Sequence, residues 1–362
     1  MSLSGPLVSD ALAFDAARPS ADAVAPIELL PKWLLCVPLV AQWFALGLRH
    51  GSFTLPSVVN PGIETGGLVG ESKLACLRLI GDAFRTWVAE TAAVPPDIDP
   101  EMIRDRQGLR YPLIVKPDVG WCGFGVRRVE NAAELRAYRS RSPNGTLLLQ
   151  RLIEGGGEAG LFYVRQPGAR RGRLSALTLR HRPVILGDGR ATLEELIGRE
   201  RRTRRALSLF RAVLPPGALA RVPVAGEHVI LSTVASTRVG ARYEAAPHLI
   251  TQRLETTLNA IARSMGDFHF GRFDVKFTSE ADLAAGRFVI IEVNGAGAEA
   301  IQHWDPRLSL PEALQGVFAK QSQLFALAAE MRRRGHRPVS VGALAEAFFF
   351  QRALIRDYPP SN

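Results

Sequence analysis

The chain has 362 residues, 47% hydrophobic and 22% charged, which is enough to bury a large core. Its net charge of +10 comes mostly from scattered arginines, and no recognition motif with interleaved aromatic residues accompanies them. We therefore expect no nucleic-acid partner. The three cysteines stand far apart, which excludes a disulfide framework and favours a reducing compartment, the cytoplasm.

Residues 1–25 are small, rich in alanine, serine and aspartate, and unpatterned. This composition predicts a flexible N-terminal arm. The stretch has no basic start followed by a compact apolar run, so we do not expect a signal peptide.

The segment 29–48 is strongly apolar and nearly as long as a membrane span, but Pro31, Lys32, Pro38 and Gln42 interrupt it. Its tryptophans and the basic residues that follow it are typical of a membrane interface. Three interpretations stay open: a helix that belongs to the core or covers a substrate, a peripheral or re-entrant membrane contact, and a true span.

A glycine-rich stretch at 60–71 leads into a predicted helix over 72–90. It does not match the phosphate-loop pattern, because the lysine follows Ser72 rather than a glycine. Lys73 would lie in the first helical turn, which is unfavourable for a cation unless it holds an anion there. A lysine in solvent is the alternative interpretation.

The stretch 111–117 predicts a strand that ends with Lys116. Gly120, Gly123 and Gly125 follow it before the next strand. Such a glycine-rich flap can place backbone N–H groups over phosphates.

Residues 131–139 predict a short helix with Asn131 as its N-cap, and residues 146–150 predict a strand. Residues 173–181 predict another strand. Thr192 and Glu195 form a capping box for a further helix. The basic stretch 199–205 predicts a solvated helical face; a contact with an acidic substrate or a membrane is the alternative interpretation.

The most informative stretch is F-V-I-I-E-V-N-G-A-G-A-E at 288–299. Its apolar run predicts a buried strand, and the spacing of two places Glu292 and Asn294 on one face. A second strand at 271–276 carries Arg272 and Asp274. If the two strands are antiparallel, Asp274, Glu292 and Asn294 offer the hard oxygen ligands that Mg²⁺ prefers.

R-x-D followed by I-E-V-N resembles the metal-binding end of the ATP-grasp superfamily, in particular D-alanine–D-alanine ligase-like and cyanophycin-synthetase-like carboxylate–amine ligases. The lysine strand with its glycine flap and the stretch V-x-x-G-D-G-x-x-T-x-x-E-L-I at 184–197 resemble the same superfamily. The resemblance covers roughly residues 65–305.

The resemblance implies an α+β ATP-grasp fold, with two α/β lobes that clasp ATP and an N-terminal apolar, helical extension. We expect five parts: a flexible arm (1–25), an apolar segment with the glycine-rich loop (26–70), the N-terminal lobe with the phosphate lid (71–150), the C-terminal lobe with the metal site (151–308) and a C-terminal helical segment (309–362).

The resemblance also implies roles for individual residues. Metal ligands would be Asp274, Glu292 and Asn294, holding two Mg²⁺ ions, or Mn²⁺. Phosphate contacts would come from Lys73, Lys116 and the flap glycines Gly120, Gly123 and Gly125. Adenine would lie at Gln150, Arg151, Leu152 and Ile153, and Glu158 or alternatively Glu154 would bind the ribose. Arg272 and Arg180 would be catalytic.

The implied reaction is ATP-dependent joining of a small-molecule carboxylate to an amine through an acyl phosphate, with release of ADP and phosphate. D-alanine–D-alanine ligases follow the metal asparagine with Ser-Pro-Gly, whereas this chain has Gly295-Ala296-Gly297, which argues against D-alanine as substrate. Alternatives are an ATP-grasp kinase acting on a small or lipid-linked molecule, and a non-catalytic, membrane-associated nucleotide-binding scaffold. No pattern indicates the oligomeric state.

Overall fold

The computed structural model describes residues 20–142 and 144–361. Most of the expected N-terminal arm, residues 1–19, therefore lies outside the described residues.

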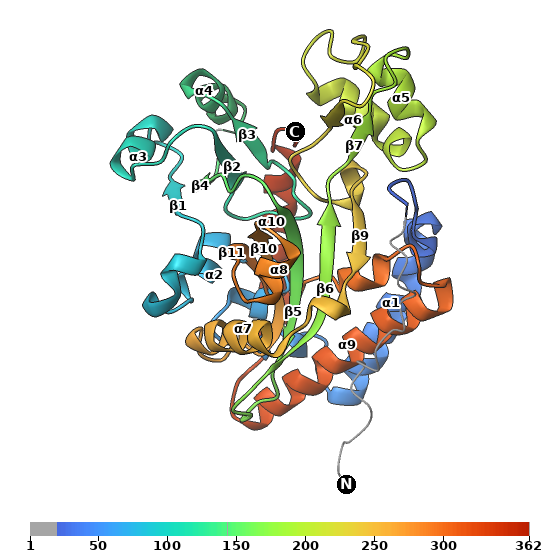
Figure 1. Ribbon diagram of the computed structural model, residues 1–362. Coiled ribbons are helices and arrows are strands. Elements are labelled where there is room, and N and C mark those ends of the chain that lie inside the picture. The colour runs from blue at the N-terminus through green and yellow to red at the C-terminus, as the bar shows by residue number, and fades with distance from the viewer. Residues whose placement is uncertain (1–19, 143, 362) are drawn as a thin grey trace.

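A five-stranded antiparallel sheet forms the centre of the molecule (Figure 1). Its strand order is β11 (Val289–Asn294), β10 (Phe270–Phe277), β5 (Gly157–Val164), β6 (Arg173–His181) and β9 (Arg242–Ala245). The antiparallel pairing of β10 with β11, expected from the two motifs, is confirmed.

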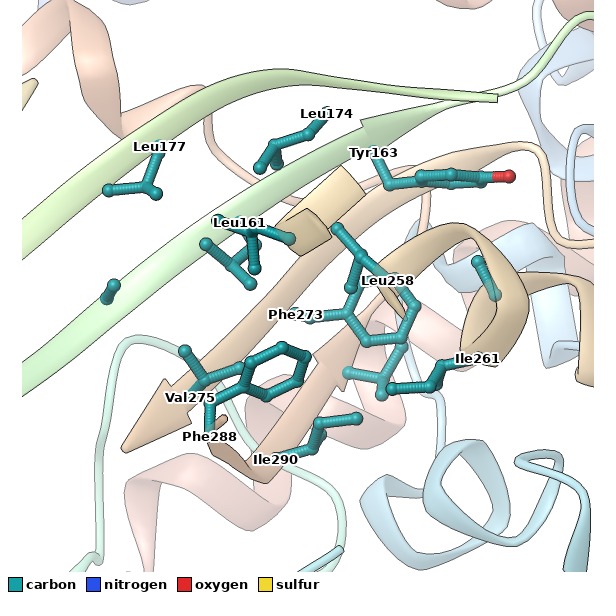
Figure 2. Close-up of a cluster of buried hydrophobic side chains, with 14 of the residues drawn as sticks. Leu161, Tyr163, Leu174, Leu177, Leu258, Ile261, Phe273, Val275, Phe288 and Ile290 are labelled. Atoms are coloured by element: carbon teal, nitrogen blue, oxygen red, sulfur yellow. The ribbon is translucent and has the colours of Figure 1, made fainter. Parts of the chain in front are cut away.

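One face of this sheet is apolar and packs on α7 (Gln252–Ser264), α8 (Glu280–Ala284) and α2 (Lys73–Arg78). Figure 2 shows Leu161, Phe273 and Val275 of the sheet meeting Leu258 and Ile261 of α7. Because successive side chains of a strand point to opposite faces, the residues between them face the other way. Phe162, Val164 and Phe270 accordingly pack on α9 (Leu310–Arg333) and the turn η2 (Leu55–Val58). Beyond these three residues, that second face becomes polar.

A smaller antiparallel sheet of four strands has its own core beneath α3 (Pro100–Arg106) and α4 (Ala132–Arg141). Its order is β1 (Thr91–Val94), β4 (Leu147–Arg151), β2 (Leu113–Pro117) and β3 (Arg127–Val129). A bridge from Val88 to Ile290 and the bond from Ala89 N to Ile290 O bring it against β11. The expected N-cap is present, since Asn131 Oδ1 accepts a hydrogen bond from Glu134 N at 3.0 Å.

A third, two-stranded unit lies on the other side of the upper end of the central sheet (Figure 1). It contains β7 (Val184–Leu186), β8 (His228–Ile230), α5 (Leu193–Arg199) and α6 (Leu207–Val213) around a separate core. The predicted capping box of Thr192 and Glu195 is confirmed at the start of α5.

The ends of the described chain are helical: α1 (Lys32–His50) packs along α9, and α10 (Val341–Arg356) follows α9. Among the described residues, α1 included, no helix combines the length and hydropathy of a membrane span. The remaining 3₁₀ turns are η1 (Pro26–Leu29), η3 (Glu64–Gly67), η4 (Asp82–Trp87), η5 (Thr203–Ala206), η6 (Thr237–Val239), η7 (Pro247–Leu249) and η8 (Ile301–Trp304).

Two helix predictions were wrong in extent. The helix expected over 72–90 ends at Arg78, because extended backbone at Gly81, whose N–H bonds to Ser264 Oγ, turns the chain before η4 begins. The basic stretch 199–205 is not one helix, since Glu200 is extended and separates α5 from the short turn η5. The α+β class and the two-lobed arrangement were predicted correctly.

Candidate active site

A cavity of about 990 Å³ lies where the polar end of the central sheet meets the small sheet and the β7–β8 unit. Fourteen of the site residues named from the sequence line it: Lys73, Lys116, Gly120, Gly123, Gln150, Arg151, Leu152, Ile153, Glu158, Arg180, Arg272, Asp274, Glu292 and Asn294. Gly125 does not line it; a Cβ there would meet Pro117 and the Tyr138 hydroxyl, and Tyr138 donates to Gly125 O at 2.6 Å. Gly125 therefore faces the core of the small sheet.

The metal motif comes together as the strand pairing requires. Asp274 is opposite Glu292, and Arg272 is opposite Asn294, on the neighbouring strands β10 and β11. Asn294 Nδ2 lies 3.4 Å from Asp274 Oδ2. A register shift just after Asp274 ends this regular pairing.

The Asp274 carboxylate is buried and bound by two arginines. Arg272 donates to it through Nε at 2.6 Å and Nη2 at 3.1 Å, and Arg180 Nη1 lies 3.0 Å away. Burial acts to raise the pKa of Asp274, but Arg272 and Arg180 outweigh burial and hold it below its usual range. Asp274 is thus an anion with its charge already balanced on one side.

Glu158 is held in a row of charges that crosses three strands. Its Oε1 lies 2.9 Å from Arg180 Nη1, and its Oε2 lies 2.8 Å from Lys276 Nζ. Both carboxylate oxygens of Glu158 thus already have cationic partners. Ribose binding by this residue stays a prediction. Glu154, the alternative, also lines the cavity and is exposed.

Lys116 reaches across from the small sheet to β11. Its Nζ donates to Gln150 Oε1 and to Ile291 O, both at 3.0 Å. Burial lowers the pKa of Lys116 to about 8, although the charge of Glu292 acts in the opposite direction. Gln150 therefore supports Lys116 with its side chain, while its backbone belongs to β4, which pairs with β1 on one side and β2 on the other. Of the predicted adenine contacts, Leu152 and Ile153 lie just beyond that ladder.

Lys73 connects the start of α2 to the glycine loop, which we define as residues 118–126. Its Nζ donates to Gly120 O at 3.2 Å and to Asp118 O at 3.3 Å, and lies 4.0 Å from Glu292 Oε1. The two lysines predicted to hold phosphates therefore both reach β11 from different elements, Lys73 near the Glu292 carboxylate and Lys116 at the Ile291 carbonyl.

The glycine loop meets the segment 232–238 over the cavity. A Cβ on Gly123, whose φ is +71°, would lie 2.7 Å from Val234 Cγ1. The Arg238 guanidinium lies 4.2 Å from the centroid of the Phe124 ring. Ser236, Thr237 and Arg238 of this segment line the cavity.

Sequence reasoning gave no role to Gly160 or Glu71. Gly160 is opposite Asp274 on β5, and a Cβ there would lie 2.9 Å from Arg272 Cδ. Glu71 lines the cavity with a buried Oε2 that has no hydrogen-bond partner among the described residues. Neither residue belongs to a motif, so only the strand register and the fold could reveal them.

The residues present fit a divalent cation by their donor chemistry. Asp274 and Glu292 supply carboxylates on adjacent strands, Asn294 supplies an amide oxygen, and Glu71 lines the same cavity. Within the described residues, no group of three or more His, Cys, Asp or Glu side chains is placed to hold a metal. The predicted set contains only two such residues, since its third member is an asparagine.

The described residues thus define an α+β protein with two antiparallel sheets around one polar cavity. No family model and no curated protein matches the chain. Solved structures similar to it are ATP-grasp enzymes, as the motifs led us to expect.

A D-alanine–D-alanine ligase from Bacillus anthracis is 12% identical with a TM-score of 0.43, and the match covers 76% of this chain and 72% of that one. The VanG D-Ala:D-Ser ligase from Enterococcus faecalis is 14% identical with a TM-score of 0.41, covering 74% and 64%. A bifunctional glutathione synthetase from Pasteurella multocida is 14% identical with a TM-score of 0.32, covering 64% of this chain and 34% of that one.

Proposed function

We propose that this chain is an ATP-dependent carboxylate–amine ligase that acts through an acyl phosphate. The observation that supports this most directly is the convergence of Lys73 and Lys116 on β11, beside Asp274, Glu292 and Asn294, in one cavity. Phosphoryl transfer depends on positioning and on positive charge around the transferred group, and this cavity offers both.

ATP would lie between the two sheets. Leu152 and Ile153 supply apolar surface for adenine, and the glycine loop with Lys73 and Lys116 faces the phosphates. Asp274, Glu292 and Asn294 would hold Mg²⁺, which when bound offsets the charge on the phosphate oxygens.

Arg272 and Arg180 keep their charge at fixed positions. Arg180 is bonded to Glu158, to Asp274 and to Ala235 O, so it acts by field rather than by movement. Arg272, held by Asp274 and by Glu299 O at 2.9 Å, lies at the cavity wall where an acyl phosphate would form.

In the first step, an oxygen of the substrate carboxylate attacks the γ-phosphorus, the bond to the β–γ bridging oxygen breaks, and ADP leaves. In the second step, the amine attacks the acyl carbon, the tetrahedral intermediate expels phosphate, and the amine loses a proton. The cations named above are the groups of this chain that can stabilise the negative charge in both steps.

The turn after the metal strand supports a substrate other than D-alanine. A Cβ on Gly295 would lie 2.6 Å from Gly66 O, and Gly297 N donates to Gly67 O at 2.6 Å. The chain's own loop thus fills the space beside Gly295 and Gly297. Glu299 and Glu71 remain as carboxylates in the cavity that could bind a substrate amine.

The test is incubation with Mg-ATP, a fractionated small-molecule extract and hydroxylamine. We expect ADP and a hydroxamate whose mass identifies the acid. ADP with a phosphorylated product and no hydroxamate would favour the kinase alternative instead.

Calorimetry of Mg-ATP binding tests the metal ligands directly. Glu292→Ala should lose Mg²⁺-dependent ATP affinity, whereas Glu130→Ala, which removes an exposed carboxylate outside the cavity, should retain it. Equal affinity in both variants would contradict the metal assignment.

One observation favours a peripheral membrane contact in addition. Five large apolar side chains lie exposed along α1 at spacings of three or four residues: Trp33 (66%), Val37 (62%), Val40 (52%), Phe44 (54%) and Leu48 (73%). Residues at this spacing share one helical face. The opposite face of α1 packs on α9, where Gln42 Nε2 donates to Phe318 O at 3.0 Å.

The charge around this apolar stripe suits an anionic lipid surface. No aspartate or glutamate occurs in α1, and Lys32 and Arg49 lie at its two ends. Arg332 and Arg333 of α9 lie near His50. Burial and these positive charges lower the pKa of His50. Leu30, Lys32 and Leu35 also line the cavity, which would let a substrate with an apolar tail enter from the lipid side.

Flotation with vesicles of phosphatidylcholine and phosphatidylserine tests this second proposal. We expect the wild-type chain to float and Phe44→Glu to stay at the bottom of the gradient. Val224→Glu, which changes a valine that is 70% exposed and far from α1 in the sequence, is the control and should float. Flotation of Phe44→Glu, or a wild-type chain that does not float, would overturn the proposed contact.

A further inference from the structure

The last described residues of the chain pack against the glycine loop. We define the C-terminal strap as residues 351–361, which begins in the last turns of α10 and continues past its end. Three of its side chains donate hydrogen bonds to three carbonyls of the glycine loop. Tyr358 Oη donates to Val119 O at 2.7 Å, Gln351 Nε2 to Gly120 O at 3.3 Å, and Ser361 Oγ to Gly123 O at 2.6 Å.

The loop that receives these bonds has an irregular backbone. Cys122 has a φ of +48°, a left-handed conformation that costs free energy for a residue with a side chain, and Gly123 has a φ of +71°. A backbone of this kind keeps its shape when the surrounding structure fixes it. The carbonyl bonds from the strap supply that restraint.

Gln351 also connects two cavity loops. Its Oε1 accepts a bond from Gly70 N at 3.0 Å, while its Nε2 donates to Gly120 O. Gly70 lies three residues before Lys73, whose Nζ donates to the same Gly120 carbonyl. The side chain is buried at 6% exposure, so water does not substitute easily for either bond.

The far end of the strap fixes the loop on the opposite wall. Ser361 Oγ accepts from Arg238 Nη2 at 2.9 Å, and the Arg238 guanidinium stacks on Phe124 of the glycine loop. Burial, with the charges of Asp118 and Asp357, raises the pKa of Tyr358 to about 12, so its hydroxyl stays a hydrogen-bond donor well above neutral pH.

We infer that the C-terminal strap positions the glycine loop over the nucleotide phosphates, with Gln351, Tyr358 and Ser361 as positioning residues that act through the loop's carbonyls. This inference rests on the proposed ATP site. It predicts that weakening the strap lowers nucleotide affinity, while the metal strands β10 and β11 keep their structure.

The test compares Tyr358→Phe with Tyr163→Phe, since each removes one tyrosine hydroxyl that donates a hydrogen bond. Tyr163 Oη bonds to Asn259 Oδ1 at 2.8 Å in the core beside α7, away from the loop. Hydrogen exchange is measured on the nucleotide-free protein, so that this readout does not depend on ATP binding. We expect faster exchange within residues 118–126 in Tyr358→Phe, no change there in Tyr163→Phe, and unchanged exchange within residues 270–277 in Tyr358→Phe.

Steady-state kinetics then link the loop to the nucleotide. Loss of one buried hydrogen bond should raise the KM for ATP by about 3- to 10-fold in Tyr358→Phe, with kcat changed less than about 2-fold. Ser361→Ala should behave in the same way, and Ser361→Thr, which keeps a hydroxyl, should restore the wild-type KM.

The outcomes separate the strap from the proposed function. Loop exchange identical to wild type in both Tyr358→Phe and Ser361→Ala would overturn the strap inference, whatever the activity. A wild-type protein that binds no Mg-ATP would overturn the proposed function, and the exchange data would still decide whether the strap restrains the loop.

Discussion

Gly160 on β5 leaves the space in which the side chain of Arg272 on β10 lies. A Cβ at this position would come within 2.9 Å of Arg272 Cδ and within 2.8 Å of Ile301 Cδ1. The missing side chain lets the guanidinium lie over the sheet and bind both oxygens of Asp274. A glycine in the interior of a strand usually weakens that strand. Gly160 is explained by packing, because a side chain at this position would clash with Arg272 and Ile301.

Gly160→Ala should therefore displace Arg272 from Asp274. We expect kcat of the proposed ligase to fall by about 100-fold, in the range seen when one electrostatic donor is lost. Overpacking should lower the free energy of unfolding by about 1–3 kcal/mol, measurable by denaturant titration. Gly198→Ala is the control, because its Cβ would meet nothing within 4 Å in α5, and it should be neutral or stabilise by up to about 1 kcal/mol. Unchanged turnover in Gly160→Ala would show that Arg272 does not need this position.

The N-terminal part of the described chain is fixed by a buried ion pair. Arg202 donates to Glu28 at 3.0 and 3.1 Å and to Ala23 O at 2.7 Å, and the two paired side chains are 3% and 7% exposed. Glu28→Ala leaves this guanidinium buried without its carboxylate, so the free energy of unfolding should fall by about 3–5 kcal/mol.

The control for this second prediction is an exposed pair. Arg211 and Glu194 are 59% and 40% exposed, and Glu194→Ala should change the free energy of unfolding by about 0–1 kcal/mol. Similar small losses in both variants would mean that water or neighbouring groups solvate Arg202 when Glu28 is removed.

The features that the sequence predicted are those carried by local patterns. The apolar run before Glu292 and the spacing of two to Asn294 depend on strand geometry alone, so the side-by-side placement of the metal motif could be predicted. The pairing of Arg180 with Asp274 and Glu158 joins strands far apart in the chain, and only the register of β10, β5 and β6 makes it visible.

The features that were missed use groups without a sequence signature. Gln351, Tyr358 and Ser361 bond to backbone carbonyls, which every residue has, so no partner motif exists to be recognised. The helix predicted over 72–90 was too long because apolar residues continue at helical spacing past Arg78. The competing influence is tertiary: Ser264 Oγ binds Gly81 N where the chain turns.

The lowered pKa of Lys116 makes nucleotide affinity depend on pH. Its pKa of about 8 arises because burial disfavours the ammonium form, against the opposing charge of Glu292. ATP phosphates favour the charged form, so affinity should be constant below pH 8 and fall as the pH rises through this value. Between pH 7 and pH 9 the decrease should be about 10-fold by proton linkage.

Calorimetric titration of Mg-ATP at several pH values, in wild type and Lys116→Arg, checks this prediction. The arginine stays charged throughout, so the decline above pH 8 should disappear in the variant. Burial also lowers the pKa of Lys320 to about 8, but this lysine does not line the cavity and is present in both proteins. A decline in affinity that persists in Lys116→Arg would therefore show that a group other than Lys116 causes it.

Lys116 has the opposite influence on stability. The unfolded chain, with a lysine pKa of 10.5, binds more protons above pH 8, so the free energy of unfolding should rise with pH from about 8 to 10.5. Lys116→Met should flatten that rise, which denaturant titration across this pH range would measure.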